Sequence, residues 1–438
     1  MRDLLEKTLE EVKKENAQGD LIFQSSKSLK LSAFGKDLTE YKVSGSQVLG
    51  LRLIKNSKVG LAYTESLDQD SLKNLVKAAL ANAHASSEHE YEQIAHNEGE
   101  VHDEELTEQA EVDVEEKIKK VTGLLEEFKA LDSRVESLPY NGYVENENFN
   151  IYLNSHHRFV TRKDRFFQSW AMPLLLENGK KSTYYDYSIA SSYQNLEWDR
   201  IKKDTLAITD ALLKTVHLKT AKYNVEFTSE CLSDFFQKFS GVFSAKSVLN
   251  KMNPWEKLLG KQVIHEDLTL VDDSLFKDAF SHYRCDSEGF DHKRVTLIEN
   301  GELKTFLHNS ATAKQLGQEN TFHGLRSPGS SLGVGRTNFI LTGKKSHHFN
   351  DDFVEIIQLD GLFSGSNEVT GDFSCGVKGF LHKNGEKIPF ADATLSGNFF
   401  EMLKHLSVVG TALQADTGKS LFTPKIIFHD LSIAGQGS

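Results

Sequence analysis

The chain has 438 residues, of which 39% are hydrophobic and 26% charged, as in an ordinary water-soluble globular protein. At ~150 residues per domain, this length corresponds to about three structural units. No apolar run reaches the ~18 residues that a membrane-spanning helix needs, and the charged N-terminus lacks the hydrophobic stretch of a secretory signal. With only three cysteines, a disulfide scaffold is excluded. We therefore expect a cytoplasmic protein that does not engage a membrane.

The net charge of −12 is concentrated in one stretch of the chain. Between Glu88 and Glu116 lie thirteen acidic residues and no Lys or Arg, and elsewhere the basic and acidic residues nearly cancel. A nucleic-acid-binding domain usually presents a basic face, because neutralising phosphates supplies most of its affinity. No such face is evident, so direct binding of nucleic acid is not expected.

The first part of the chain reads as a small antiparallel sheet with helices on one face. Apolar residues at helical spacing predict helices over 3–15 and 68–85. Segments rich in β-formers predict short strands, with turns between them at Phe34-Gly35, Ser44-Gly45-Ser46 and Lys55-Asn56. These strands are 21–24, 28–34, 40–43, 48–54 and 60–64.

The acidic segment 88–116 is expected to be a linker or an exposed loop. After it, the pattern predicts a helix over 112–131, strands at 135–138, 148–153, 158–164 and 166–173, and a helix over 198–216. The pattern restarts near 219–222. We therefore expect an N-terminal α+β domain over 1–218, with sub-regions 1–87 and 112–218 joined by the acidic segment, and a second domain over 219–438.

The second domain is expected to be β-rich with a few helices. Glycine-punctuated strands dominate from about Val263 onward, and helices are predicted over 229–239 and 398–413. The overall fold class is therefore α+β: a mixed N-terminal region with an antiparallel sheet, followed by a β-rich C-terminal domain.

No complete metal or nucleophile motif stands out among the polar residues. The spacing His-Glu-x-x-His is absent, and so is the longer His-Glu-x-x-x-His. The nearest histidine group is His84 and His89 with His96 and His102 downstream, and it is better explained as a charged surface segment. Cys375 lies between glycines, where a thiol could be exposed, but no histidine base can be assigned to it.

Several blocks of the chain resemble the TldD/PmbA family, and within it the TldE branch. The N-terminal block is Gly45-Ser-Gln-Val-Leu-Gly50-Leu-Arg52, and the middle block runs from Asp286-Ser-Glu-Gly289 to Asn300-Gly301. The most specific block is C-terminal, with Gly371-Asp372-Phe373-Ser374, Gly379-Phe380, Asn384-Gly385-Glu386 and Ser396-Gly397-Asn398. Taken together, these blocks make the resemblance strong and extend it over nearly the whole chain.

The resemblance implies a chain without a catalytic metal of its own. TldD-type members carry a His-Glu-x-x-x-His helix and a later cysteine, and this set holds a metal that activates water. The matching segment here begins Ser229-Glu230-Cys231 and contains no histidine, while Cys375-Gly376 falls where the TldD cysteine falls. Cys375 is thus only a weak metal candidate, and the zinc is expected in a TldD-type partner. By family motif, the candidate peptide- or partner-binding residues are Gly371, Asp372, Phe373, Ser374, Gly376 and Asn398.

The resemblance therefore implies a TldE-like subunit of a two-chain metalloprotease that acts on unfolded peptides, in peptide maturation or antitoxin degradation. A second hypothesis makes the chain a self-sufficient metallo- or cysteine-dependent peptidase that uses Cys375 or the histidines between His84 and His102. A third makes it a non-enzymatic adaptor that modulates DNA gyrase or its inhibitor. The substrate, the partner's identity and the formation of a homodimer are left open by the sequence.

Overall fold

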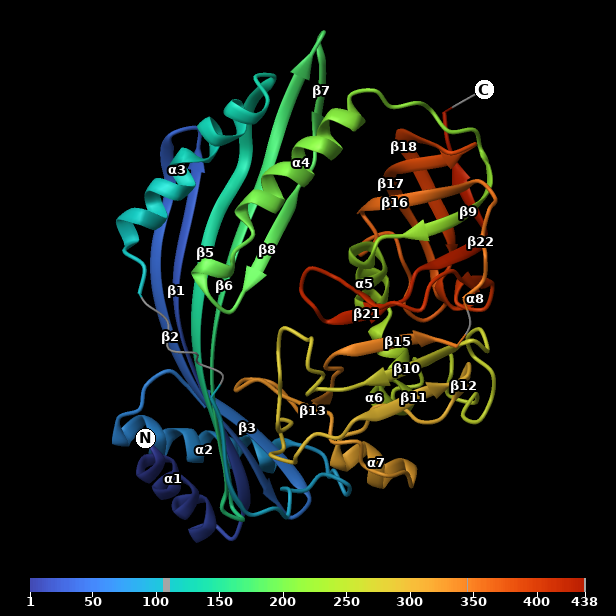
Figure 1. The fold of residues 1–438 in the computed structure, drawn as a ribbon. Coiled ribbons are helices and arrows are strands. Elements are labelled where there is room, and N and C mark those ends of the chain that lie inside the picture. The colour runs from blue at the N-terminus through green and yellow to red at the C-terminus, as the bar shows by residue number, and fades with distance from the viewer. Residues whose placement is uncertain (105–110, 345, 437–438) are drawn as a thin grey trace.

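The computed structural model describes residues 1–104, 111–344 and 346–436. Within these residues the fold is mixed α+β, with a long curled antiparallel sheet in the N-terminal half and a β-rich C-terminal half that contains a small barrel (Figure 1). The α+β class predicted from the sequence is confirmed. No helix among the described residues is long and apolar enough to cross a membrane.

The N-terminal sheet has the strand order β3-β2-β1-β5-β6-β4, and β7 and β8 also pair with β6. All pairs are antiparallel except that of β4 with β6. The strands are β1 (Gln18–Phe34), β2 (Asp37–Lys55), β3 (Lys58–Thr64), β4 (Gly99–Glu104), β5 (Val135–Asn154), β6 (Arg158–Glu177), β7 (Lys180–Thr183) and β8 (Asp186–Ala190). Asn56 and Ser57 both have positive φ, as a two-residue hairpin between β2 and β3 requires.

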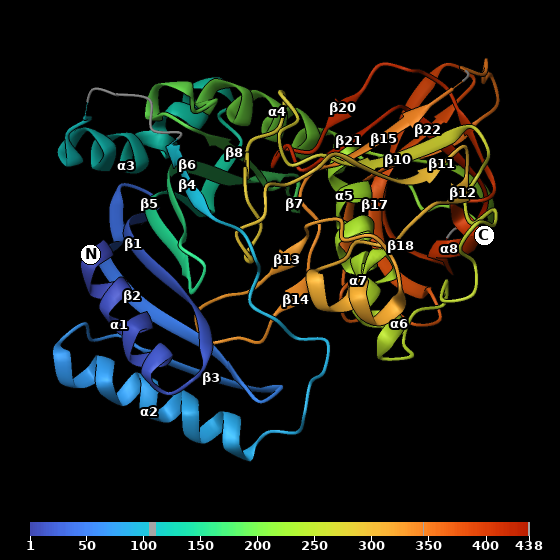
Figure 2. The same ribbon diagram turned by 90° about the horizontal axis from the view of Figure 1, so that it is seen from below.

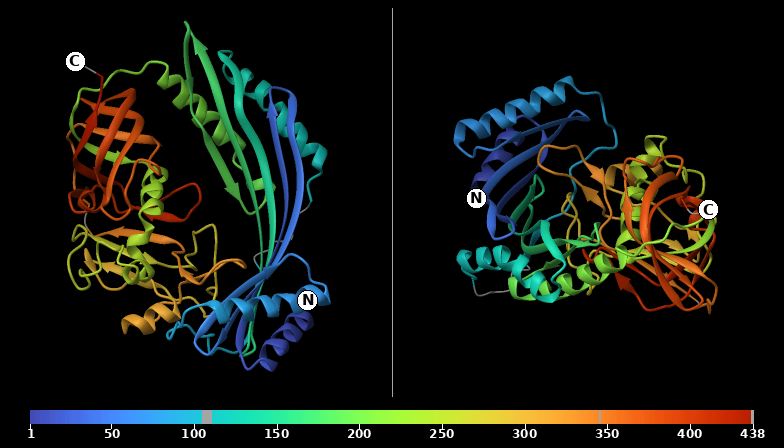
Figure 3. Two further views of the ribbon diagram at one scale, coloured as in Figure 1. Left: turned by 180° about the vertical axis from the view of Figure 1, so that it is seen from behind. Right: turned by 90° about the horizontal axis from the view of Figure 1, so that it is seen from above.

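Four helices cover one face of this sheet: α1 (Arg2–Lys14), α2 (Gln69–Ala85), α3 (Val114–Leu131) and α4 (Trp198–Leu212) (Figure 3). Side chains alternate between the two faces of a strand. On β1, Leu21 and Phe23 share a core with α1 and α2, and Leu29 and Leu31 share a second core with α3 and α4. The opposite face, which carries Gln24, is turned towards the C-terminal half (Figure 2). All four helices were predicted within a few residues of their observed ends.

The sequence predicted separate strands on either side of residues 25–27 and of residues 44–47. Both breaks are wrong, because β1 and β2 each run through them without interruption. Ser44-Gly45-Ser46, predicted as a turn, lies inside β2, and its residues pair with Ser28, Lys27 and Ser26 of β1. Ser26 and Ser46 line a cavity. The polar residues in mid-strand therefore mark a wet face of the sheet instead of a chain reversal.

The acidic segment is more ordered than the expected loop. Gly99–Glu104 forms the edge strand β4, and Asp103 on it is only 8% exposed. Helix α3 begins at Val114, with the Asp113 side chain accepting a hydrogen bond from the backbone N–H of Glu115. Residues 105–110 of the segment lie outside the described residues.

The C-terminal half contains two six-stranded sheets and a short hairpin. In one sheet the order is β18-β17-β16-β9-β22-β19, and pairing of β18 with β22 closes it into the small barrel. Its strands are β9 (Ala221–Phe227), β16 (Phe353–Asp360), β17 (Asp372–Lys383), β18 (Glu386–Asn398), β19 (Leu406–Val408) and β22 (Ile426–Ala434). The other sheet contains β10 (Leu268–Asp272), β11 (Val295–Glu299), β12 (Glu302–Leu303), β15 (Phe339–Gly343), β20 (Gln414–Ala415) and β21 (Leu421–Thr423), and β13 (Gly324–Leu325) pairs with β14 (Gly333–Val334).

Helices of this half are short: α5 (Ser229–Lys238), α6 (Ala245–Leu249), α7 (Ser310–Leu316) and α8 (Phe399–Met402). Helix α5 was predicted, whereas the helix expected over 398–413 is wrong. Only α8 forms there, and the chain then continues as β19, which pairs with β22. Phe399 stacks on Phe239, just beyond α5, with ring centroids 4.6 Å apart. The apolar residues of 398–413 are therefore buried as parts of a short helix and a strand, and not on one face of a long helix.

Candidate functional site

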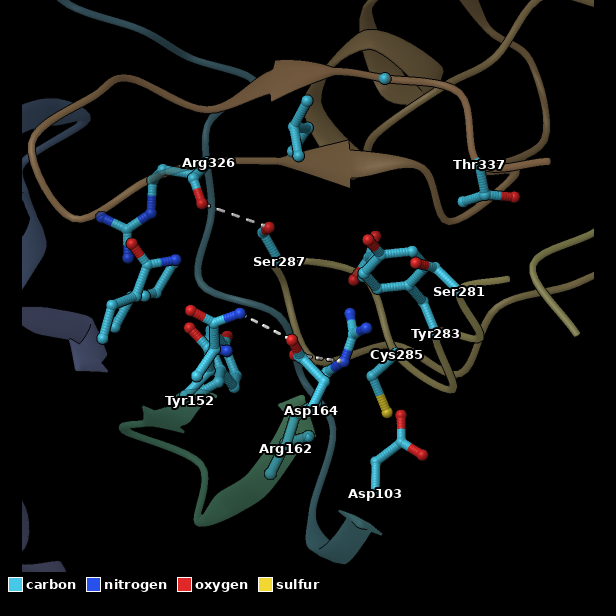
Figure 4. Close-up of a pocket in the computed structure, with 18 of the residues that line it drawn as sticks. Asp103, Tyr152, Arg162, Asp164, Ser281, Tyr283, Cys285, Ser287, Arg326 and Thr337 are labelled. Carbon is cyan, nitrogen blue, oxygen red and sulfur yellow. Dashed lines mark hydrogen bonds and ion pairs between the residues drawn. The ribbon is translucent and has the colours of Figure 1, made fainter. Parts of the chain in front are cut away.

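A large cavity lies between the bare face of the N-terminal sheet and the loops of the C-terminal half (Figure 4). Its volume is about 910 Å³, within the usual range of ligand sites. Strands β1, β2, β5 and β6 form one wall, and the segments 280–292, 323–326, 335–338 and 418–420 form the other. The cavity therefore exists only where the two halves of the chain face each other.

The sheet wall carries a polar cluster centred on Asp164. The Arg162 Nε lies 3.3 Å from an Asp164 carboxylate oxygen, and the Asn148 amide donates to Asp164 at 2.7 Å. The guanidinium of Arg162 also lies over the ring of Tyr283, 3.7 Å from its centroid. This contact joins the sheet to a loop of the C-terminal half, across one end of the cavity.

A buried ion cluster includes Arg326, which is one of the residues that line the cavity. Asp20 Oδ2 accepts hydrogen bonds from Nε and Nη2 of Arg52 at 3.0 and 2.6 Å, and Asp20 Oδ1 accepts from Nη2 of Arg326. Glu92 accepts a further bond from Arg52 at 3.0 Å. All the side chains except that of Glu92 are at most 1% exposed. Buried charges of this kind are tolerated only when they are paired.

Two more acidic side chains lie beneath the loop that carries Ser287. Asp286 accepts hydrogen bonds from the backbone N–H groups of Glu288, Phe290 and Gly324, at 2.9–3.0 Å. Glu288 accepts from the backbone N–H and the hydroxyl of Ser310. Burial raises the pKa of both carboxyl groups, that of Asp286 well above its usual range. These hydrogen bonds fix the backbone of the loop 286–290, and the bond from Gly324 to Asp286 attaches that loop to β13.

Helix α5 is the element where the TldD resemblance placed metal ligands. It starts at the Thr228 cap and presents Glu230, whose two carboxylate oxygens accept from the Tyr187 hydroxyl at 2.9 Å and the Thr417 backbone N–H at 2.8 Å. Burial, with Glu230 and Asp416 nearby, raises the pKa of Asp234 to about 6. No imidazole is on this helix. Glu230 thus joins β8 to the loop before β21.

Cys375 does not offer a good thiolate ligand. It is 4% exposed on β17, and burial raises the pKa of its thiol to about 12. Cys231 of α5 lies near it, is 2% exposed, and has a thiol pKa that burial also raises. A metal-binding thiol normally has a lowered pKa. These residues therefore do not fit the family's catalytic metal, and among the described residues no group of three or more His, Cys, Asp or Glu side chains could hold a metal ion.

The four histidines between His84 and His102 are spread over separate elements. His84 is exposed near the end of α2. The ring of His96 contacts that of His156, with centroids 4.0 Å apart and the planes tilted by 37°. His102 Nδ1 lies 2.8 Å from the Thr161 hydroxyl, between β4 and β6. The structure therefore does not assemble them into one site.

The family-motif residues lie around the start of β17 and the end of β18. Asn398 donates to the Thr370 carbonyl and the Asp372 carboxylate and caps α8, while Gly371 has a φ of 85° and is packed against Phe400. Phe373 is buried, and Ser374 shares a hydrogen bond with Ser396. Neither these residues nor Gly376 belong to the described residues that line the cavity.

The two halves of the chain match models of one family. Residues 19–83 match PmbA/TldA metallopeptidase domain 1, and residues 220–435 match the PmbA/TldA metallopeptidase C-terminal domain. The chain belongs to the PmbA/TldD family. Both the N-terminal and the C-terminal blocks of the resemblance fall inside the matched residues.

Relatives of this PmbA/TldD chain align along nearly its whole length. An uncharacterized protein of Methanocaldococcus jannaschii is 27% identical, and the alignment covers 97% of this chain and 98% of that protein. A metalloprotease PmbA homolog of Haemophilus influenzae is 24% identical, and the alignment covers 99% of this chain and 96% of that protein. Among solved structures, TldE from Thermococcus kodakarensis superposes with a TM-score of 0.84 at 19% identity, covering 99% of this chain and 100% of its own. A candidate modulator of DNA gyrase from Thermotoga maritima superposes with a TM-score of 0.85 at 23% identity, with coverages of 99% and 100%.

Sequence reasoning did not identify the residues that line the cavity. The block Asp286-Ser-Glu-Gly289 was recognised as a family segment, but nothing in it indicated that it packs against a sheet more than a hundred residues away. Arg326 and Arg336 lie in glycine-containing loops without a motif. The one available signal was the run of polar residues inside β1 and β2, of which Ser44-Gly45-Ser46 was predicted as a turn.

Proposed function

We propose that this chain is a TldE/PmbA-like subunit that acts with a TldD-type metalloprotease chain on unfolded peptides. The observation that supports this most directly is that α5 lacks the side chains a catalytic metal would need. It carries no histidine, and both oxygens of its Glu230 are engaged by Tyr187 and Thr417. A glutamate that activates a metal-bound water needs a free oxygen, so hydrolysis is assigned to the partner's zinc.

The proposal locates the complex in the cytoplasm. All three cysteines are free, as is usual in a reducing compartment. The partner is a TldD-type chain, the substrate is a peptide, and neither nucleic acid nor a membrane takes part. The motif residues Gly371, Asp372, Phe373, Ser374, Gly376 and Asn398 stay candidates for contact with the peptide or the partner.

Reconstitution with a partner tests this proposal. The chain, a TldD-type protein from the same genome, and an equimolar mixture of the two would each be incubated with a quenched-fluorescence unfolded peptide. We expect no hydrolysis by the chain alone, hydrolysis by the mixture, and loss of that activity with a chelator. Hydrolysis by the metal-depleted chain alone would overturn the proposal.

The two alternatives give different outcomes in the same assay. A self-sufficient peptidase would be active alone and would lose activity in Cys375→Ala or in a variant lacking the four histidines. The candidate gyrase modulator of Thermotoga maritima has this fold, and an adaptor of that kind would co-purify with gyrase or its inhibitor without changing any hydrolysis rate. Both alternatives stay predictions until the assay is done.

A further inference from the structure

Three rows of side chains cross the sheet wall of the cavity, because directly opposed residues of neighbouring strands share one face of a sheet. The first row is Ser46, Ser26, Asn148 and Asp164, the second is Val48, Gln24, Asn150 and Arg162, and the third contains Ile22, Tyr152 and Val160. In the first row the hydroxyls of Ser26 and Ser46 lie 2.9 Å apart, and Asn148 donates to Asp164 at 2.7 Å. That row therefore satisfies much of its own hydrogen-bonding capacity.

The second row contains two amides that the protein does not use. Gln24 of β1 and Asn150 of β5 are directly opposite each other. Within residues 1–104, 111–344 and 346–436, no hydrogen bond engages either side-chain amide, and neither is sealed off from solvent. Gln24 is exposed and Asn150 is half-buried, and both line the cavity. The pair therefore offers donors and acceptors to a ligand.

The charged side chains of the cavity leave no cation without a carboxylate nearby. Four arginines line it, and each is close to at least one acidic side chain. These neighbours are Asp164 for Arg162, Glu145 for Arg165, Asp20 for Arg326, and Asp272 and Asp416 for Arg336. A charged ligand would have to compete with these internal partners, so the cavity favours an uncharged one.

Apolar side chains lie beside the two amides and on the opposite wall. Val48 and Val160 of the sheet are half-buried, as is Phe280 of the facing loops. Leu325, also on that wall, is 59% exposed. Apolar groups of a ligand would remove part of this surface from water. A few placed polar groups among apolar side chains are the usual composition of a ligand site.

The chemistry of the amide pair matches an extended polypeptide backbone. A primary amide presents a donor and an acceptor side by side, and the N–H and C=O of one extended residue point the same way and present the complementary groups. We propose that the cavity binds an uncharged, extended peptide segment, with its backbone bonded to the amides of Gln24 and Asn150 and its side chains against the apolar residues. That the ligand is a peptide rests on the proposed function, whereas the amide chemistry and the charge balance follow from the cavity itself.

The test is isothermal titration of the purified full-length chain without a partner. The probe is an acetylated and amidated octapeptide of alternating Ser and Val. In two comparison peptides the N–H of every Val, or of every Ser, is replaced by an ester oxygen, which removes the donors of one edge of the extended chain. We expect at least one ester peptide to bind ~10-fold more weakly, because an amide oxygen of the cavity then loses its donor. Replacing two Ser residues by Glu or by Lys should not tighten binding.

Matched amide variants assign the binding to the cavity. Gln24→Leu and Asn150→Leu should each weaken binding of the probe by ~10-fold and reduce the discrimination against the ester peptide. Both should fold, since neither side chain forms a hydrogen bond within the described ranges. Asn146→Leu is the control, because Asn146 lies on the same face of β5 but is not one of the described residues that line the cavity. It should bind the probe as the unmodified chain does.

Three results would overturn the proposal. The first is no binding of the probe, or equal binding of the probe and both ester peptides. The second is unchanged affinity in both Gln24→Leu and Asn150→Leu, which would place the peptide elsewhere. The third is ~10-fold tighter binding of the Glu or the Lys peptide, which would show that a charge is preferred. Because these titrations need neither a partner nor hydrolysis, their failure is distinct from a failure to reconstitute the two-chain protease.

Discussion

Asp20 and Arg326 are 306 residues apart in the sequence and form a fully buried ion pair. Asp20 is on the first strand of the N-terminal sheet, and Arg326 follows β13 of the C-terminal half. Removing one partner of such a pair leaves an uncompensated charge in the interior, which is far more costly than losing a surface pair. The two halves of the chain are therefore energetically coupled at the wall of the cavity.

We expect Asp20→Asn to lower the free energy of unfolding by about 3–5 kcal/mol, because both Arg52 and Arg326 lose their shared carboxylate. Urea unfolding at pH 7 measures this. Glu100→Gln, which removes a partner of the exposed Arg2, is the control and should change stability little. In an Asp20→Asn background, Arg326→Met should cost less than it does in the unmodified chain, and simple additivity would contradict the coupling.

Gly50 should not tolerate a side chain. A Cβ atom there would lie 2.0 Å from the backbone oxygen of Pro328, on the loop that follows Arg326. Gly50→Ala should therefore displace that loop and cost ~1–3 kcal/mol in urea unfolding. Gly45→Ala is the matched control on the same strand, where the nearest atom is 3.7 Å away, and its effect should stay within ~0.5 kcal/mol. Equal effects of the two substitutions would argue against close packing of this loop on β2.

The raised pKa of Asp234 predicts a pH dependence of stability. The folded-state pKa of about 6 exceeds the unfolded value of ~3.9, so the native state binds more protons between these values. The contribution of Asp234 to stability should therefore fall as the pH rises from about 4 to 6. Asp234→Asn should remove this slope and stabilise the protein at pH 7 by about 1 kcal/mol, a figure reduced because the carboxyl group is partly exposed. Unfolding curves at several pH values measure it, and an unchanged slope in the variant would refute the assignment.

Cys375 should be chemically quiet in the folded protein. Its burial and its pKa of about 12 leave almost no thiolate at pH 8, so it should react with iodoacetamide far more slowly than in urea. Mass spectrometry after timed labelling gives the rate at each cysteine, and Cys285, which is less buried than the other two, should label first. Cys375→Ala should leave hydrolysis by the reconstituted pair unchanged. Loss of that activity in a folded variant would favour a catalytic thiol.

Two substitutions of Asn398 distinguish a structural role of its side chain from contact with a peptide or a partner. Asn398→Ala should cost about 1 kcal/mol, because the cap of α8 and the bond to the Thr370 carbonyl are lost. Asn398→Ser restores a capping oxygen and should recover most of that loss. If Asn398→Ser is stable and supports full activity of the pair, the side chain acts on the backbone alone. Stability without activity would support contact with peptide or partner.

Local pattern determined much of this protein's architecture. Helices α1, α2, α3 and α5 could be predicted because each carries an apolar stripe at helical spacing, and such a stripe needs only one surface to cover it. The same kind of apolar stripe gave the wrong helix over 398–413. Phe399, Phe400 and Met402 do lie on a helix, but the spacing of Leu406 and Val408 fits a strand as well as it fits a helix. Pairing with β22, in which Leu406 lies opposite Phe428, decided between the two.

The family could also be read from the sequence alone, because its blocks are short and contiguous in the chain. The cavity could not, since its walls come from strands near the N-terminus and from loops beyond residue 279. Ser26 and Ser46 look like turn residues locally, whereas the pairing of β1 with β2 places them in mid-strand, on a wall of the cavity. The shared carboxylate of Asp20 was decided in the same way: charge pairing at close range depends on distances in space, and spacing along the chain does not encode them.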